Sequence, residues 1–229
     1  HRVDRRQRQM CIRDRDSITL SLDTLDKHKI SVINGTKKNF KLMPLLESIE
    51  KNFNIIKTNT VVIKDVNDDE VIDIINHMKN FRSEIRFIEY MDVGESNKWD
   101  PSKVVSSESL LESINEHYSL RQMKTETSST AKKWHIKDSN SSIGLISSIT
   151  QPFCSSCNRA RLSVDGKLFT CLFASNGFDI KSVIRSDNYE EKLLEFFKKI
   201  WMERSDQYSQ IRFSSKRDLP KVEMSYIGG

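Results

Sequence analysis

Apolar side chains recur along the first part of the chain with two different periods, which together predict alternating strands and helices. Ile18–Leu22, Ile55–Ile63 and Ile85–Tyr90 are short runs rich in β-branched residues, which is typical of strands. Lys41–Phe53 and Glu70–Lys79 instead place apolar residues three or four positions apart, which predicts helices with one apolar face. The order strand, helix, strand, helix, strand predicts parallel strands with right-handed crossovers.

The pattern changes near residue 95, where a long polar loop begins. Ser107–Tyr118 and Asn188–Arg204 then predict helices, and Trp134–Lys137 and Ile143–Ile149 predict strands. The apolar face of the last helix holds Leu193, Leu194, Phe197, Ile200 and Trp201. At the start of the second helix, the turn Val66-Asn67-Asp68 is expected to supply an N-cap.

Three cysteines carry the clearest chemical signal. The sequence reads Cys154-Ser-Ser-Cys157, and Cys171 follows after a short gap. Thiolates are soft ligands, so this set suits iron–sulfur or zinc. Three ligands leave a fourth position, which another residue fills or which stays open for a substrate.

The segment between the cysteines predicts a hairpin. Asp165-Gly166 is a two-residue turn signal, and a type I′ turn there would pair Ala160 with Cys171. This pairing would bring Cys171 back toward Cys157. Two arginines in the same segment, Arg159 and Arg161, would share one face of the extended chain and reach one phosphate or carboxylate together.

The charge distribution and the lengths of the apolar runs argue against nucleic-acid-binding and membrane-spanning functions. Of the net charge of +5, +4 lies in residues 1–15, so the rest of the chain gives no case for nucleic-acid binding. That Arg-rich segment, which includes Cys11, is expected to be a foreign or disordered leader, with a native basic arm as the alternative. No apolar run is long enough to span a membrane, and no secretory signal is recognised. Four cysteines in 229 residues do not make a disulfide scaffold, so a cytoplasmic, reducing setting with thiols as ligands is expected.

Several sequence words, taken in order, resemble one family. They are Ser21-Leu-Asp-Thr-Leu-Asp, Lys57-Thr-Asn, Ile85-Arg86-Phe-Ile-Glu-Tyr-Met91-Asp-Val-Gly, Phe153-Cys-Ser-Ser-Cys-Asn-Arg-Ala-Arg-Leu, Asp165-Gly-Lys-Leu-Phe-Thr-Cys and the closing Ile227-Gly-Gly. Together they resemble the GTP 3′,8-cyclase family of molybdenum cofactor biosynthesis, which are radical S-adenosylmethionine lyases. The resemblance covers about Ser17 to Gly229.

The resemblance implies an α/β fold, the later part of a (β/α)6 partial TIM-type barrel followed by a C-terminal cluster-binding region. It implies three ranges: the leader at 1–15, later barrel units at 16–105, and a cluster- and GTP-binding region at 106–229. The family's first-cluster motif, CxxxCxxC, does not occur in this sequence. We therefore expect an N-terminally truncated chain that does not turn over alone.

The resemblance also implies site residues. Cys154, Cys157 and Cys171 would hold a second 4Fe–4S cluster, whose open iron binds the guanine of GTP. Arg159, Arg161 and Lys57 would contact GTP, and Arg86 is expected in the same cavity. Ser21 and Met91 would contact S-adenosylmethionine. The pair Gly228-Gly229 resembles a tail that enters the active site.

The implied reaction is the first step of molybdenum cofactor synthesis. A 5′-deoxyadenosyl radical, made from S-adenosylmethionine at the first cluster of the full-length protein, would take the 3′ hydrogen of GTP. The C3′ radical would then attack C8 to give 3′,8-cyclo-GTP, which a cyclic pyranopterin monophosphate synthase would take. A homodimer is left open, and no nucleic-acid or membrane partner is expected.

Other interpretations remain open at this point. The cysteines could form a non-catalytic, zinc-stabilised binding module, with His135 or His117 as fourth ligand. A third possibility is a nucleotide-binding remnant that keeps the cluster without catalysis. Lys57 and Arg86 could be salt-bridged structural residues in buried strands. Ser21 could simply end its strand, and Met91 could be core filler.

Overall fold

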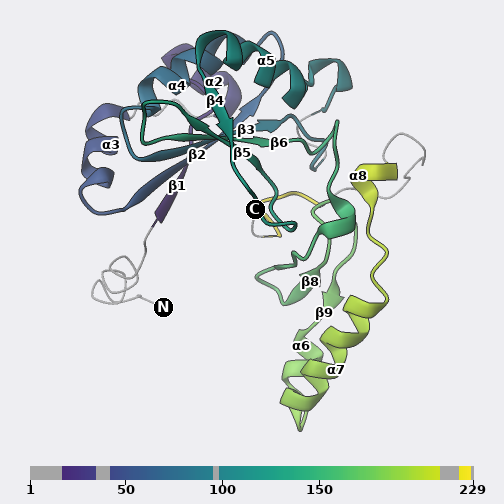
Figure 1. The fold of residues 1–229 in the computed structure, drawn as a ribbon. Helices are drawn as coiled ribbons and strands as arrows, with labels where there is room; N and C mark the ends of the chain where they lie inside the picture. Colours follow the sequence, from purple (N-terminus) through teal and green to yellow (C-terminus); the bar gives the residue numbers. More distant parts are fainter. Residues whose placement is uncertain (1–16, 35–41, 95–97, 212–221, 228–229) are drawn as a thin grey trace. The chain divides into compact units, whose positions relative to one another are not determined.

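The computed structural model describes residues 17–34, 42–94, 98–211 and 222–227 (Figure 1). The chain forms two compact units. His1–Tyr90 with Ser102–Thr150 form the first, here called the sheet unit, and Met91–Pro101 with Gln151–Gly229 form the second, here called the cysteine unit. The predicted leader, Cys11 and the terminal glycine pair lie outside the described residues.

One six-stranded sheet organises the sheet unit, in the spatial order β1-β2-β3-β6-β5-β4. The first four of these strands are parallel, β5 runs antiparallel to β6, and β4 runs antiparallel to β5. The strands are β1 Ser17–Ser21, β2 Ile55–Val62, β3 Ser83–Glu89, β4 Leu120–Gln122, β5 Lys132–Ile136 and β6 Ser142–Ile146. The predicted α/β class with parallel strands is therefore confirmed.

Helices pack against the sheet and bury one of its faces (Figure 1). They are α2 Lys27–Asn34, α3 Leu42–Glu50, α4 Val71–Met78, preceded by the short 3-10 turn η1 Asp68–Glu70, and α5 Ser107–His117. Burial alternates along β2, where Ile56, Thr58, Thr60 and Val62 are buried and Lys57, Asn59 and Val61 are half-buried. Because side chains on a strand alternate between faces, Lys57 and Asn59 lie on the face away from the helices.

One loop residue of the sheet unit, Asn67, has a different role from the one expected. The turn Val66-Asn67-Asp68 was expected to supply an N-cap; Asn67 occupies the cap position of η1, but its side chain makes no capping hydrogen bond there. Its amide instead donates to the carbonyls of Asp23 (2.7 Å) and Val61 (2.9 Å) and accepts from the amide of Ile63 (2.8 Å). Asn67 therefore joins two strand ends rather than starting a helix.

Smaller elements build the cysteine unit. A three-stranded antiparallel sheet contains β7 Arg161–Leu162, β8 Lys167–Phe169 and β9 Phe178–Asp179. The helices are α6 Lys181–Ile184, α7 Tyr189–Met202 and α8 Tyr208–Ile211, with the 3-10 turn η3 at Cys154–Ser156; a further 3-10 turn, η2, spans Pro101–Lys103. Helix α7 was predicted, but much of its apolar face, including Leu194 and Trp201, is exposed.

The compact units differ from the predicted ranges 16–105 and 106–229, because β4, β5 and β6 join the same sheet as β1, β2 and β3. The compact units are defined by contacts within the fold, whereas the ranges 16–105 and 106–229 were predicted from function. The structure therefore does not test these ranges, and they remain predictions. In the part of the chain that the structure describes, no helix has the length and apolar character that crossing a bilayer requires.

Candidate functional site

The first two cysteines share one turn. Cys154 begins the short 3-10 turn η3, and the amide of Cys157 donates to the carbonyl of Cys154 over 3.2 Å. Cys154, Cys157 and Cys171 are all free thiols and partly buried. A CxxC segment in a tight turn lets both sulfurs point toward one bound group, as cluster and metal sites require.

The hairpin between Cys157 and Cys171 exists, but its predicted register is wrong. Arg161 pairs with Phe169 and Leu162 with Leu168, so the turn has three residues rather than two. The amide of Gly166 donates to the carbonyl of Ser163 (3.0 Å), and Gly166 adopts φ +84. This is a type I turn followed by a left-handed glycine, one of the common three-residue hairpin loops.

Ser163 explains the preference for this longer turn. Its hydroxyl bonds the carboxylate of Asp165 (2.5 Å) and accepts from the amide of Lys167 (3.0 Å). A two-residue turn would break both contacts. The hairpin still folds the chain back so that its two arms lead to Cys157 and Cys171, although Ala160 is not set opposite Cys171 by this register.

Burial alternates along the arm that follows Cys157. Cys157, Arg159 and Arg161 are half-buried, while Asn158 and Ala160 are exposed. In extended chain this alternation puts the thiol and both guanidinium groups on one face. The structure therefore brings together one cysteine and both arginines that were predicted from the sequence.

Arg159 is held beside a thiol in this structure. Its guanidinium donates to Sγ of Cys157 over 3.2 Å and lies 4.9 Å from the ring centre of Phe153. Burial would raise the pKa of Cys157, but the backbone amide of Arg159 and the guanidinium groups of Arg204 and Arg159 outweigh it and lower that pKa. Cys157 is thus biased toward the thiolate, the form that binds iron or zinc.

Burial also shifts the pKa values of Cys171 and Arg161. Burial raises the pKa of the Cys171 thiol, with Asp206 and Cys154 adding to the effect. Burial and the nearby charge of Arg159 lower the pKa of Arg161. Two cations at close range repel one another, so an anionic ligand between them would relieve both effects.

Three thiolates can bind a 4Fe–4S cluster or, with a fourth ligand, a zinc ion. Among the residues that the structure describes, no three His, Cys, Asp or Glu side chains converge closely enough to hold one metal ion. Sulfur ligands of one zinc ion lie about 3.8 Å apart, because each Zn–S bond is about 2.3 Å. A 4Fe–4S cluster spreads its thiolates more widely, because each binds a different iron. His135 and His117, the suggested fourth zinc ligands, belong to the sheet unit.

Three of the remaining predicted residues lie in the sheet unit. Ser21, Asn59, Arg86 and Gly144 form one row across the parallel strands β1, β2, β3 and β6. A Cβ on Gly144 would lie 3.3 Å from Cγ of Arg86, so the glycine leaves room for the arginine side chain. Paired positions in a sheet point to the same side, so Ser21 and Arg86 share the face that carries Lys57.

Glu84 controls the charge on this face. It accepts from Nε of Arg86 over 2.6 Å and from Nζ of Lys133 over 2.9 Å. Burial would raise the pKa of Glu84, but the hydrogen bonds from Arg86 and Lys133 outweigh it and hold the pKa below its usual value. Arg86 is thus salt-bridged. Lys57 stands opposite Glu84 in register, and in the described chain no hydrogen bond or ion pair of Lys57 is found.

Met91 follows β3 directly but belongs to the cysteine unit. Its neighbour Asp92 is 2% exposed and accepts a 2.6 Å hydrogen bond from the hydroxyl of Tyr208, which is 6% exposed. This bond fixes the segment after β3 to α8. The structure does not test the predicted cofactor contacts of Met91 or Ser21.

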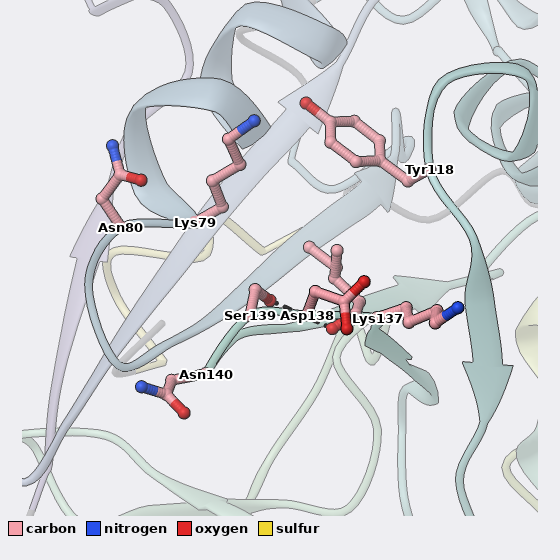
Figure 2. A pocket seen from close by; sticks show the side chains of 8 residues that line it. Lys79, Asn80, Tyr118, Lys137, Asp138, Ser139 and Asn140 are labelled. Atoms are coloured by element: carbon pink, nitrogen blue, oxygen red, sulfur yellow. Dashed lines mark hydrogen bonds between the residues drawn. The ribbon is translucent and has the colours of Figure 1, made fainter.

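A surface pocket of about 330 Å³ lies elsewhere (Figure 2). It is lined by Lys79, Asn80, Tyr118, Ile136, Lys137, Asp138, Ser139 and Asn140. Lys79 and Asn80 precede β3, and Lys137–Asn140 precede β6, so the pocket lies at the amino ends of parallel strands. Ligand sites of parallel α/β sheets form at the carboxyl ends of the strands, which argues against a catalytic role for this pocket.

Comparison with known proteins places the chain in a family. The sequence profile described as Molybdenum Cofactor Synthesis C matches residues 83–210, more than half of the chain. The chain belongs to the Molybdenum Cofactor Synthesis C family. The matched residues include the three cysteines, Arg159, Arg161, Arg86 and Met91, whereas Ser21 and Lys57 lie outside them.

The family assignment agrees with individual relatives. Curated proteins named GTP 3′,8-cyclase, from Staphylococcus aureus strains JH9, Newman and Mu3, are 41% identical to the chain over 220 residues. The match covers 93% of this chain and 64% of each relative. The resemblance drawn from the sequence words is therefore confirmed, and the chain spans about 64% of the length of these relatives.

Two site residues of this Molybdenum Cofactor Synthesis C chain were missed by sequence reasoning. Glu84 lies just before the predicted strand Ile85–Tyr90 and was given no role, and Arg204 was predicted only as the end of a helix. Glu84 lies two positions before Arg86, and residues two apart on a strand lie on the same face. This spacing could have predicted the ion pair between them. Arg204 gave no such signal, because its partners are backbone carbonyls far away in the sequence.

Proposed function

We propose that this chain carries the substrate-binding cluster site and part of the nucleotide site of a GTP 3′,8-cyclase. The observation that carries the proposal is the shared face of Cys157, Arg159 and Arg161, on a hairpin arm whose partner arm leads to Cys171. The name of the Staphylococcus aureus relatives supplies the substrate and the reaction. The activity is proposed for the whole enzyme, which acts in molybdenum cofactor synthesis.

In this proposal Cys154, Cys157 and Cys171 hold a 4Fe–4S cluster. With three protein ligands, such a cluster offers one open iron that coordinates a donor atom of guanine. Arg159 and Arg161 bind the phosphates or the base through their planar forks. Arg159, which now donates to Cys157, would turn toward the nucleotide, because the cluster takes over that sulfur.

The residues of the sheet unit have narrower roles in the proposal. Lys57 neutralises a phosphate, and Arg86 contacts the nucleotide while Glu84 fixes its guanidinium. Ser21 and Met91 contact S-adenosylmethionine. The reaction joins C3′ of the ribose to C8 of guanine, so binding groups must hold sugar and base in one conformation.

The proposal also includes the finer fold and setting. The parallel strands of the sheet unit are the later part of a (β/α)6 partial barrel, with functional ranges at 16–105 and 106–229. A cytoplasmic location follows from the use of free thiols as ligands. A cyclic pyranopterin monophosphate synthase would take the product.

Nucleotide binding tests the proposal directly. The parent chain, reconstituted anaerobically with iron and sulfide, is titrated with GTP alongside Arg159→Gln and Arg161→Gln, with Arg185→Gln as control. Arg185 is an exposed arginine of the same unit. Each charge-assisted hydrogen bond contributes about 1.5–3 kcal/mol, so each site variant should weaken GTP binding roughly 10- to 100-fold.

The control should bind GTP like the parent, and ATP should compete poorly, because guanine rather than adenine carries the cluster contact. Equal GTP binding by the parent and both site variants would contradict the assignment of these arginines.

A further inference from the structure

Arg204 lies just beyond α7, and its side chain is only 11% exposed. Its guanidinium donates to the carbonyl of Cys157 and to the carbonyl of Thr170, each over 2.7 Å. It also donates to the carboxylate of Asp206 over 3.2 Å. A largely covered cation with three acceptors is fixed in place rather than free to sample solvent.

The two carbonyls belong to the two segments that carry the proposed cluster ligands. One is the carbonyl of Cys157, in the turn that also holds Cys154, and the other directly precedes Cys171. Backbone pairing of the hairpin is described only as far as Arg161 opposite Phe169. Beyond that point, among the described residues, Arg204 bridges the two arms where they lead to the cysteines.

The bridge needs an arginine. A guanidinium presents several N–H groups in a rigid plane and can therefore span two carbonyls at a fixed separation, whereas a lysine ammonium is a point charge on a flexible stem. The ring of Trp201 lies 4.9 Å from the guanidinium carbon and supports its orientation. The two hydrogen bonds from the guanidinium therefore set the separation between the carbonyls of Cys157 and Thr170, and so between the two cysteine-bearing segments.

We propose that Arg204 is a positioning residue of the cluster site, which sets the separation of the two cysteine-bearing segments and keeps a fixed positive charge beside the bound cluster. The inference rests on the proposed function, because it presumes that the cysteines hold a cluster. Outer-shell residues of this kind orient ligands and tune the metal without binding it.

The test compares Arg204→Lys and Arg204→Met with the parent and with Arg185→Met, a matched loss of an exposed arginine in the same unit. Each chain is reconstituted anaerobically, and iron and sulfide per chain are measured before a chelator is added. The rate of iron release should rise about 10- to 100-fold in both Arg204 variants, the usual cost of losing an outer-shell partner. Arg185→Met should release iron at the parental rate.

The midpoint potential of the cluster separates positioning from a merely structural role. Arg204→Met removes a nearby positive charge, so its cluster should be harder to reduce than the parental cluster, while Arg204→Lys should stay closer to the parent. If Arg204→Met does not fold, Arg204→Lys alone decides through its rate of iron release.

Two results would overturn the inference, and they are distinguishable. Parental rates of iron release in both folded Arg204 variants, or in Arg204→Lys where only that variant folds, would reject the role of Arg204 and leave the cluster proposal standing. A parent chain that takes up no iron or sulfide would reject the proposed function and this inference together.

Discussion

Single side chains fix the charge on each candidate face. Glu84, with a side chain only 10% exposed, holds Arg86 and Lys133 at once. Cys157 faces Arg159, and Asp165 holds the turn between the hairpin arms. At Glu84 and at Cys157 a short polar contact fixes the position of a cation, which matters for a site that binds an anion.

Glu84→Gln should destabilise the sheet unit at pH 7 by roughly 2–3 kcal/mol, because it removes the partner of two partly buried cations. The folded-state pKa of Glu84 is lowered, so its contribution is present at neutral pH and is lost as pH falls below about 4.5 through that pKa. Urea unfolding at pH 7 and near pH 3.5 measures both effects. The exposed Glu47→Gln should change little, and an equal loss for Glu84→Gln at both pH values would contradict the account.

Asp65 gives a second prediction at this scale. The residue has φ +58, a left-handed conformation, and its carboxylate pairs with Lys103 over 2.9 Å. Alanine and glycine both remove this exposed pair, but only glycine tolerates the conformation. Asp65→Ala should therefore be less stable than Asp65→Gly by about 1 kcal/mol, measured by urea unfolding, and the reverse order would refute a strained turn.

Elements of the sheet unit meet at one buried carboxylate. Glu89, at the end of β3, is 0% exposed and accepts from the amide and hydroxyl of Ser107 at the start of α5. It also accepts from the amides of Ile149 (2.8 Å) and Thr150 (2.9 Å), in the loop that leaves β6. One residue therefore joins a strand end, a helix start and the segment that leads on to the cysteines.

Glu89→Gln should cost about 2–3 kcal/mol, because one amide oxygen accepts fewer bonds and the new NH2 group faces existing donors. Chemical denaturation monitored by circular dichroism measures the loss. Glu112→Gln, the same change at an exposed position of α5, is the control. A Glu89→Gln chain as stable as this control would show that the network contributes little.

Sequence patterns predicted these elements unevenly. The strands β1, β2 and β3 and the helices α3, α4, α5 and α7 follow the apolar periods closely. Helix α2 and strand β4 were missed, since both are short and lack a clear apolar period. The hairpin register was wrong, because the deciding contacts come from Ser163, whose hydroxyl bonds are invisible to a turn rule based on Asp165 and Gly166.

The candidate site was predictable in part for similar reasons. Arg159 and Arg161 could be placed on one face, because the period of an extended chain is two and both lie close to Cys157. The bridge by Arg204 could not be placed, since its two acceptors precede it by 47 and 34 residues. Contacts of that range depend on the folded structure rather than on local pattern.

At the scale of the whole molecule, the two compact units meet in the sequence directly after β3. Tyr90 ends the first stretch of the sheet unit and Met91 begins the cysteine unit. The bond between Asp92 and Tyr208 spans 116 residues and anchors this crossing segment within the cysteine unit. The ring of Phe173 packs on Tyr208 at 4.9 Å, close in sequence to Cys171.

Tyr208→Phe should destabilise the cysteine unit by about 1–3 kcal/mol, because it leaves a buried carboxylate without one donor. Thermal unfolding measures the loss. Tyr189→Phe, which removes an exposed hydroxyl from α7, provides the matched control and should have almost no effect. Equal melting temperatures for the two variants would contradict an anchoring role for Tyr208.

The central claim is that Cys154, Cys157 and Cys171 hold an iron–sulfur cluster. The most direct measurement is iron, sulfide and zinc per chain after anaerobic reconstitution of the parent, Cys157→Ala and Cys11→Ala. The account predicts about four iron and four sulfide in the parent and in Cys11→Ala, and their loss in Cys157→Ala. About one zinc per chain with no iron would contradict it and would indicate a structural metal site.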